Sequence, residues 1–168
     1  TLPKINKFII EIVSLYVSLT ILCFFFYYLF GMTAFDSLIH CMSTISTGGF
    51  SNHSSSFEYF KSYSLENVSV IFMILGSLPF VIFIQFIHGQ KMSIFKDDQI
   101  KLFLSLLIII IFITSIWLTN YLKLDFLQSI RLATFNITSI LTGTGYTSSN
   151  YNNWGRFGLV IILMIMFI

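Results

Sequence analysis

Two short stretches of small and polar residues interrupt an otherwise hydrophobic sequence. The first reads Thr44-Ile-Ser-Thr-Gly-Gly-Phe-Ser51, and the second, ninety-six positions later, reads Ile140-Leu-Thr-Gly-Thr-Gly-Tyr-Thr147. Each follows a short helix-like run and lies between two long hydrophobic segments. Irregular backbone at membrane depth must be buried in protein or line a water-filled path, because lipid offers no partner to its N–H and C=O groups. The simplest chemistry for such backbone is coordination of a dehydrated cation by carbonyl oxygens.

Glycine is the residue that gives such a loop its shape. A filter needs several oxygens that already point inward, and glycine freely adopts the positive φ angles that turn successive carbonyls the same way. We therefore expect Gly49 and Gly145 to shape the two loops, with Phe50 and Tyr146 packed behind them as support. The predicted ligands are the backbone carbonyls of Ser46, Thr47, Gly48, Thr142, Gly143 and Thr144. The alternative, that both loops are packed glycine turns between tilted helices, is disfavoured by their repetition at equivalent places.

The composition places the chain in a membrane. Of the 168 residues, 56% are hydrophobic and 10% are charged, against about 25% charged residues in an ordinary globular protein. The net charge of +2 is scattered along the chain, so it indicates neither a nucleic-acid partner nor a polybasic lipid-binding patch. The sequence predicts an integral membrane protein that does not bind nucleic acid.

The hydrophobic segments predict membrane-crossing helices, the last of them incomplete, over residues 8–30, 68–87, 102–122 and from 157 onwards. Tyr27 and Tyr28 are expected at the membrane interface. Gly76, Ser77 and Pro79 predict a kink in the second span, either as a packing feature or as a hinge. The lysines at 91, 96 and 101 favour the cytoplasmic side for the connection that carries them.

Two shorter helices are predicted to enter the membrane without crossing it. One follows Thr33 and runs from Ala34 to about Ile45, and the other opens at Asp125 and ends at about Leu141. Thr33 and Asp125 are typical N-caps. The C-terminal end of each helix runs into a glycine-containing loop, where the negative end of the helix dipole would favour a cation. Residues 52–67 are predicted to form a polar extracellular loop.

These elements give the fold class: an all-α integral membrane protein built from repeated units of helix, re-entrant pore helix, filter loop and helix, as in potassium channels. The first unit spans residues 1–98, and the second spans residues 99–168 and is truncated in its last helix. The two units have the same orientation, because each contains two crossings. Two such units cannot enclose an ion path, whereas four can.

The motifs Ser46-Thr-Gly-Gly-Phe-Ser51 and Thr142-Gly-Thr-Gly-Tyr-Thr147, followed by Tyr151 and Trp154-Gly155, resemble the second and third filter repeats of the Trk/Ktr/HKT potassium transporters, in particular the bacterial TrkH type. The resemblance implies potassium uptake across the bacterial cytoplasmic (inner) membrane by a multi-pass protein. It also implies four filter units in one polypeptide, a homodimer, and a cytosolic nucleotide-binding regulatory subunit. The only metal expected is potassium at the filter residues, and no cofactor is expected.

Other reactive side chains suggest no catalytic site. Cys23 and Cys41 are expected to be small buried residues. The histidines lie on separate predicted elements, so no shared metal site or catalytic dyad is expected from His40, His53 and His88. For Arg131, a structural ion pair is favoured over a role in gating, since a charge at that depth must face protein or water.

Two other functions remain open. An intramembrane hydrolase would need a nucleophile paired with a base, and the candidates are Ser51 and His53, although the second motif has no histidine. The other alternative is a membrane scaffold fragment that does not conduct ions. The sequence does not decide potassium against sodium preference, channel-like against coupled transport, the gating residues or the regulatory nucleotide.

Overall fold

The computed structural model describes residues 2–89 and 97–167, and all regular secondary structure in these residues is helical. The longer helices are α1 (Leu2–Leu29), α2 (Ala34–Ile45), α3 (Tyr63–Ser77), α4 (Phe80–Ile87), α6 (Asp98–Leu122), α7 (Phe126–Leu141) and α8 (Gly155–Ile165). Two short 3₁₀ helices lie at Ser56–Tyr59 and Tyr151–Trp154. The predicted cytoplasmic lysines Lys91 and Lys96 lie outside the described residues.

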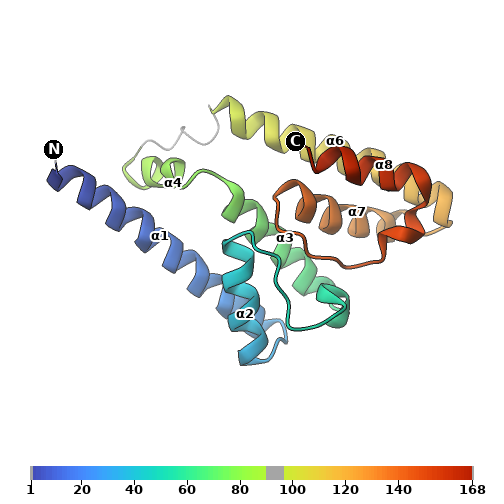
Figure 1. The fold of residues 1–168 in the computed structure, drawn as a ribbon, viewed down its shortest axis with the longest axis horizontal. Helices are drawn as coiled ribbons and strands as arrows, with labels where there is room; N and C mark the ends of the chain where they lie inside the picture. The colour runs from blue at the N-terminus through green and yellow to red at the C-terminus, as the bar shows by residue number, and fades with distance from the viewer. Residues whose placement is uncertain (1, 90–96, 168) are drawn as a thin grey trace.

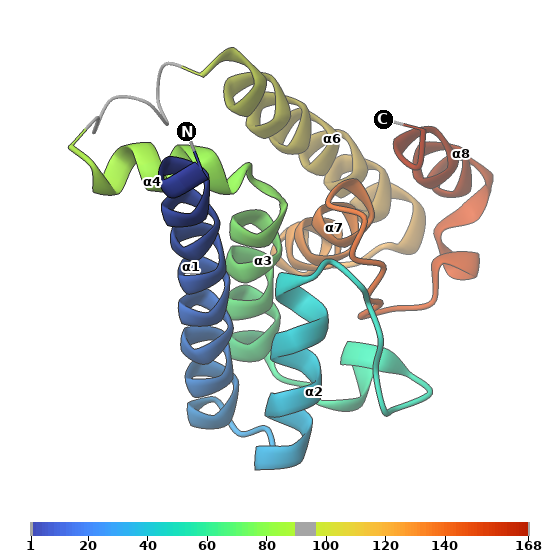
Figure 2. The ribbon, with the colours of Figure 1, turned by 60° about the vertical axis from the view of Figure 1, so that its left-hand side comes forward.

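The helices form two neighbouring groups. In the first group, α1, α2 and α3 lie side by side and α4 lies across the end of α3 (Figure 2). In the second group, α7 packs along α6, and α8 contacts both of them (Figure 1). The groups meet where α3 packs against α7. Each short helix, α2 or α7, is therefore held against a long apolar helix.

Within the part of the chain that the structure describes, two helices are long and apolar enough to cross a membrane, at Ile5–Leu29 and Asp98–Leu122. Helices α3 and α4, taken together as one broken segment, are also long and apolar enough, with an angle of 89° between them. The predicted kink is confirmed, and it is sharp enough to end one helix and start another. The break occurs at Leu78 and Pro79, where the proline has no N–H with which to continue the helix.

The N-caps expected at the short helices are present. The Thr33 hydroxyl accepts a hydrogen bond from the Asp36 N–H at 3.1 Å, and an Asp125 carboxylate oxygen accepts one from the Leu127 N–H at 3.3 Å. These bonds satisfy donors that the first turn of a helix leaves without an intrahelical partner. Helix α2 begins at Ala34 and ends at Ile45 as predicted, and α7 ends at Leu141 as predicted.

Two predictions about the first half are wrong. The predicted loop 52–67 contains a 3₁₀ helix, and α3 begins inside it at Tyr63. The reason is that the side chains of Phe57 and Leu65 are buried, at 1% and 2% exposure. Their packing orders a segment whose other side chains are mostly polar. Tyr27 does not face outward as an interfacial residue would: it is 0% exposed, whereas its neighbour Tyr28 is 54% exposed.

Two hydrophobic cores follow the two groups of helices. The first core includes Phe135 and Tyr146 from the second half of the chain beside residues of α1, α2 and α3. The second core surrounds Leu118 and Trp154. Since the first core draws on both halves, the two groups of helices interlock. Cys23 and Cys41 are buried and free, as predicted.

Candidate functional site

The two short helices end in the same way. The Ser46 N–H donates to the Met42 carbonyl at 3.1 Å, and ninety-six residues later the Thr142 N–H donates to the Thr138 carbonyl at 2.9 Å. The side-chain hydroxyls of Ser46 and Thr142 also make equivalent bonds, each donating to a carbonyl three residues earlier at 3.3 Å. The repetition seen in the sequence therefore extends to the individual hydrogen bonds that close each helix.

The loops that follow share a backbone pattern. Positive φ angles occur at Thr47 (51°) and Gly49 (66°) in the first loop and at Gly143 (74°) and Gly145 (86°) in the second. These positions correspond under the ninety-six-residue offset. The positive φ predicted for Gly49 and Gly145 is thus confirmed, and each loop alternates between the two hands of the backbone. Such alternation gives successive peptide groups an arrangement that differs from both a helix and a strand.

The loops also touch each other. A Cβ atom at Gly49 would lie 1.8 Å from the carbonyl oxygen of Thr144, so no side chain fits there. At Gly143 and Gly145 an added Cβ would meet nothing within 4 Å, and only the positive φ favours glycine. Gly49 is therefore required both for its backbone angle and for close approach of the two loops.

The aromatic residues that follow the two loops have different surroundings. Tyr146 is 0% exposed, and its hydroxyl donates to the His40 carbonyl of α2 at 3.2 Å. Its ring packs against Phe57 with a centroid distance of 4.6 Å. Phe50, expected to pack behind the first loop, is instead 78% exposed. Of the two aromatic residues, therefore, only Tyr146 packs against a helix of the other half of the chain, α2.

Thr44 joins this contact to α1. Its hydroxyl lies 2.8 Å from the Tyr27 hydroxyl, donates to the His40 carbonyl at 2.6 Å, and lies 3.3 Å from the Tyr146 hydroxyl. Three elements are thus linked through one side chain next to the first loop. Tyr27 is expected from the sequence at the membrane interface, and Phe57 lies in the stretch predicted to be a polar loop. An aromatic residue near a helix end or in a polar stretch carries no local sign of which side of the backbone is buried.

A second cluster of polar side chains lies at the start of α2. The Asp36 carboxylate accepts hydrogen bonds from Asn52 (2.5 Å), Thr33 (2.8 Å) and His53 (3.1 Å). Burial raises the pKa of Asp36, but these hydrogen bonds outweigh burial and lower it overall. The carboxylate is therefore ionised. Through Asn52 and His53 it connects the segment that follows the first loop to the N-terminal end of α2.

The serine–histidine pair that a hydrolase would need does not form between the side chains of Ser51 and His53. His53 directs its ring to Asp36, while the Ser51 hydroxyl lies 3.0 Å from Nε2 of His40. Nδ1 of His40 lies 2.8 Å from the Asp36 carbonyl, so in the neutral imidazole Nδ1–H donates to that carbonyl and Ser51 donates to Nε2. Across residues 2–89 and 97–167, no group of three or more His, Cys, Asp or Glu side chains could hold a metal ion.

Arg131 makes the ion pair that the sequence predicted. Its guanidinium donates to both carboxylate oxygens of Glu66, at 2.6 Å and 2.7 Å, and lies 3.6 Å from the centre of the Tyr63 ring. The Glu66 side chain is 4% exposed. Since Glu66 lies on α3 and Arg131 on α7, the pair connects the two groups of helices.

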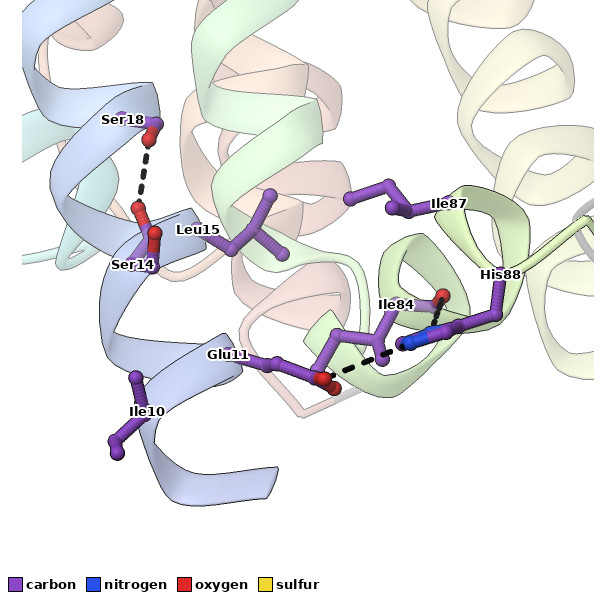
Figure 3. A pocket seen from close by; sticks show the side chains of 8 residues that line it. All are labelled: Ile10, Glu11, Ser14, Leu15, Ser18, Ile84, Ile87 and His88. Atoms are coloured by element: carbon purple, nitrogen blue, oxygen red, sulfur yellow. Dashed lines mark hydrogen bonds and ion pairs between the residues drawn. The ribbon is translucent and has the colours of Figure 1, made fainter. Parts of the chain in front are cut away.

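A cavity of about 430 Å³ lies between α1 and α4. The Glu11 carboxylate of α1 points toward His88 at the end of α4, with 3.5 Å between Oε1 and Nε2 (Figure 3). Nδ1 of His88 lies 2.9 Å from the Ile84 carbonyl. The remaining lining is mostly aliphatic, so this cavity offers few oxygen ligands compared with the loops.

Comparison with known proteins identifies relatives over the whole chain. The sequence model of the TrkH family, described as "Cation transport protein", matches residues 1–168. The Trk system potassium uptake protein TrkI of Halomonas elongata is 34% identical over 168 residues, covering 99% of this chain and 34% of the relative. The Trk system potassium uptake protein TrkH of Escherichia coli is 27% identical over 169 residues, covering 99% of this chain and 35% of the relative.

A solved structure has the same fold. The crystal structure of the potassium transporter TrkH from Vibrio parahaemolyticus matches with a TM-score of 0.90 and 29% identity, covering 97% of this chain and 36% of that one. The chain thus spans about a third of the length of the relatives that it matches. The predicted all-α membrane fold is confirmed.

Proposed function

Because the chain belongs to the TrkH family of cation transport proteins, we propose that it contributes two filter loops to a pathway for potassium uptake. The observation that carries the proposal is the matched backbone of the two loops, with positive φ at equivalent positions after two equivalent helix ends. A dehydrated monovalent cation needs several carbonyl oxygens around it. Two loops in contact at Gly49 and Thr144 supply such oxygens from both halves of the chain.

The proposed ligands are the carbonyl oxygens of the residues that precede the second glycine of each loop: Ser46, Thr47, Gly48, Thr142, Gly143 and Thr144. Gly49 and Gly145 set the backbone direction, and Tyr146 supports the second loop from behind. No supporting role is proposed for Phe50, since its side chain is 78% exposed. Helices α2 and α7 point their C-terminal ends at the loops, which favours a cation there.

Residues 1–98 and 99–168 are proposed as two units of one pathway, in the same orientation. The support is the equivalence of the α2 and α7 ends, including their hydrogen bonds. Parallel repeats are arranged around an axis along the membrane normal, so the ion path is proposed to run along such an axis between filter loops.

The location and partners follow from the same family membership. The protein is an integral membrane protein, and we place it in the bacterial cytoplasmic membrane. The resemblance to Trk transporters supports a homodimer and a cytosolic nucleotide-binding regulatory subunit. The hydrolase alternative is abandoned, because the chain belongs to a family of transporters and its Ser51–His40 contact joins the first loop to α2.

Potassium uptake by the full-length protein tests the proposal. We expect it to restore growth of an uptake-deficient bacterium at low potassium, and Gly145→Ala to reduce potassium uptake at matched membrane expression. A left-handed backbone costs a non-glycine residue roughly 1–2 kcal/mol. Gly31→Ala is the matched control, because Gly31 also has a positive φ of 105° and open space at Cβ but lies outside the loops. Equal uptake by both variants would contradict a filter role for the loop that carries Gly145, and no rescue by the wild type would leave only a non-conducting scaffold.

A further inference from the structure

A second cavity, lined by polar side chains, opens beside the second loop. It has a volume of about 270 Å³ and lies between the chain that follows the first loop and the chain that follows the second. Its lining consists largely of oxygen-bearing side chains, among them Ser54, Ser55, Glu58, Thr147, Ser149 and Asn150. At about 30 Å³ per water molecule, this volume holds a cation together with several waters.

Glu58 is held at this cavity by bonds to the second loop. Its backbone N–H donates to the Thr147 carbonyl at 3.2 Å, and the Thr147 N–H donates to the Ser56 hydroxyl at 3.3 Å. Thr147 follows Gly145 by two residues. The neighbouring Phe57 is 1% exposed and packs on Tyr146, so the 3₁₀ helix that carries Glu58 is anchored to the end of the second loop.

The charge at this cavity is a single carboxylate. Glu58 is exposed to solvent, and none of the ion pairs found within residues 2–89 and 97–167 includes it. The other lining groups are neutral hydroxyls and an amide. One negative charge among neutral oxygens suits a hydrated monovalent cation, whereas tight divalent sites use more carboxylates.

We propose that Glu58 and the hydroxyls around it form an outer binding site that concentrates hydrated potassium ions beside the filter. This inference rests on the proposed function, since it supplies ions to that pathway. The site belongs to one half of the chain only: the corresponding 3₁₀ helix that follows the second loop, Tyr151–Trp154, has the sequence Tyr-Asn-Asn-Trp and carries no acidic residue. The acidic site is therefore not a by-product of the repeated architecture.

Transport kinetics of the full-length protein test the site. We would measure initial potassium uptake against external potassium at low and at high ionic strength, with choline chloride as the added salt. For Glu58→Gln we expect the half-saturating potassium concentration to rise about threefold at low ionic strength, the factor expected for one unit charge about 6 Å away in water. The difference should vanish at high ionic strength, where charges are screened. The maximal rate should stay unchanged, and Glu58→Asp should behave like the wild type.

The matched control is Asp125→Asn. It removes one exposed negative charge at the start of α7, and asparagine still caps a helix. We expect it to leave the half-saturating concentration unchanged. An equal rise in Asp125→Asn, or no rise in Glu58→Gln, would overturn the site while potassium uptake itself persists. Absence of uptake by the wild type would instead overturn the proposed function and this site together.

Discussion

At the scale of single residues, Thr47 is the exception among the positive-φ positions of the two loops. The other three, Gly49, Gly143 and Gly145, are glycines, but Thr47 has a φ of 51°. A β-branched residue in this region is strained. Its equivalent in the second loop is Gly143, which meets the same requirement without a side chain. The first loop therefore stores conformational strain that the second loop does not.

Replacing this residue by glycine should stabilise the protein. Thr47→Gly removes left-handed strain of roughly 1–2 kcal/mol, and the greater freedom of glycine in the unfolded chain offsets up to about 1 kcal/mol of that gain. We expect a small rise in the unfolding temperature of the full-length protein in detergent. The same substitution at Thr20 in α1 should lower it, because Thr20 lies in a right-handed helix and donates to the Tyr16 carbonyl. Destabilisation by both substitutions would mean that Thr47 is unstrained.

At the scale of elements, the ion pair between Glu66 and Arg131 is the most specific connection between the two groups of helices. It joins the N-terminal end of α3 to α7 through two hydrogen bonds of 2.6 Å and 2.7 Å. Charge-assisted bidentate pairs fix geometry as well as energy. Because α7 ends in the second loop, the pair sets the position of that loop relative to α3.

Breaking this pair should destabilise the protein more than breaking an exposed pair. Glu66→Gln leaves a half-buried guanidinium without its anion, and we expect a loss of about 2 kcal/mol in the free energy of unfolding. Asp98→Asn is the control: it breaks the exposed Asp98–Lys101 pair, which should cost under about 0.5 kcal/mol. Chemical unfolding of the full-length variants measures both. Equal losses would show that the pair between α3 and α7 contributes no more than a surface contact.

The same elements show how far the sequence could predict the structure. The bounds of α2 and the end of α7 follow from local signals, namely a capping residue at one end and glycines at the other. The start of α3 within the predicted loop also has a capping residue, since the Ser62 hydroxyl accepts a hydrogen bond from the Leu65 N–H. The burial of Glu66 has no such local signal, because it depends on Arg131, sixty-five residues away. Tyr27 is likewise buried by Thr44 and Phe57. Contacts between distant segments decide which face of an apolar helix is covered, and hydrophobic patterning does not identify the partner.

At the scale of the whole molecule, the long helices direct apolar side chains outward. In the most apolar stretch of α1 only 6% of the residues are buried, and in that of α6 only 22% are. Such surfaces suit lipid or further membrane helices, because a water-facing helix would need a polar side. The buried polar residues gather instead around α2, α7 and their loops. A hydrophobic exterior with polar residues gathered in the interior is typical of an integral membrane protein.

Ion binding at the loops should stabilise the whole protein. A ligand that binds only the folded state at one hundred times its dissociation constant adds about 2.7 kcal/mol to the free energy of unfolding. We therefore expect the unfolding temperature of the full-length protein in detergent to rise by several degrees in potassium chloride relative to choline chloride at equal ionic strength. Gly145→Ala should reduce this rise because it disturbs the loop backbone, whereas Gly31→Ala should retain it. An unchanged potassium response in Gly145→Ala would place the stabilising ion elsewhere, since a filter formed by these carbonyls cannot bind normally when one of its left-handed positions is strained.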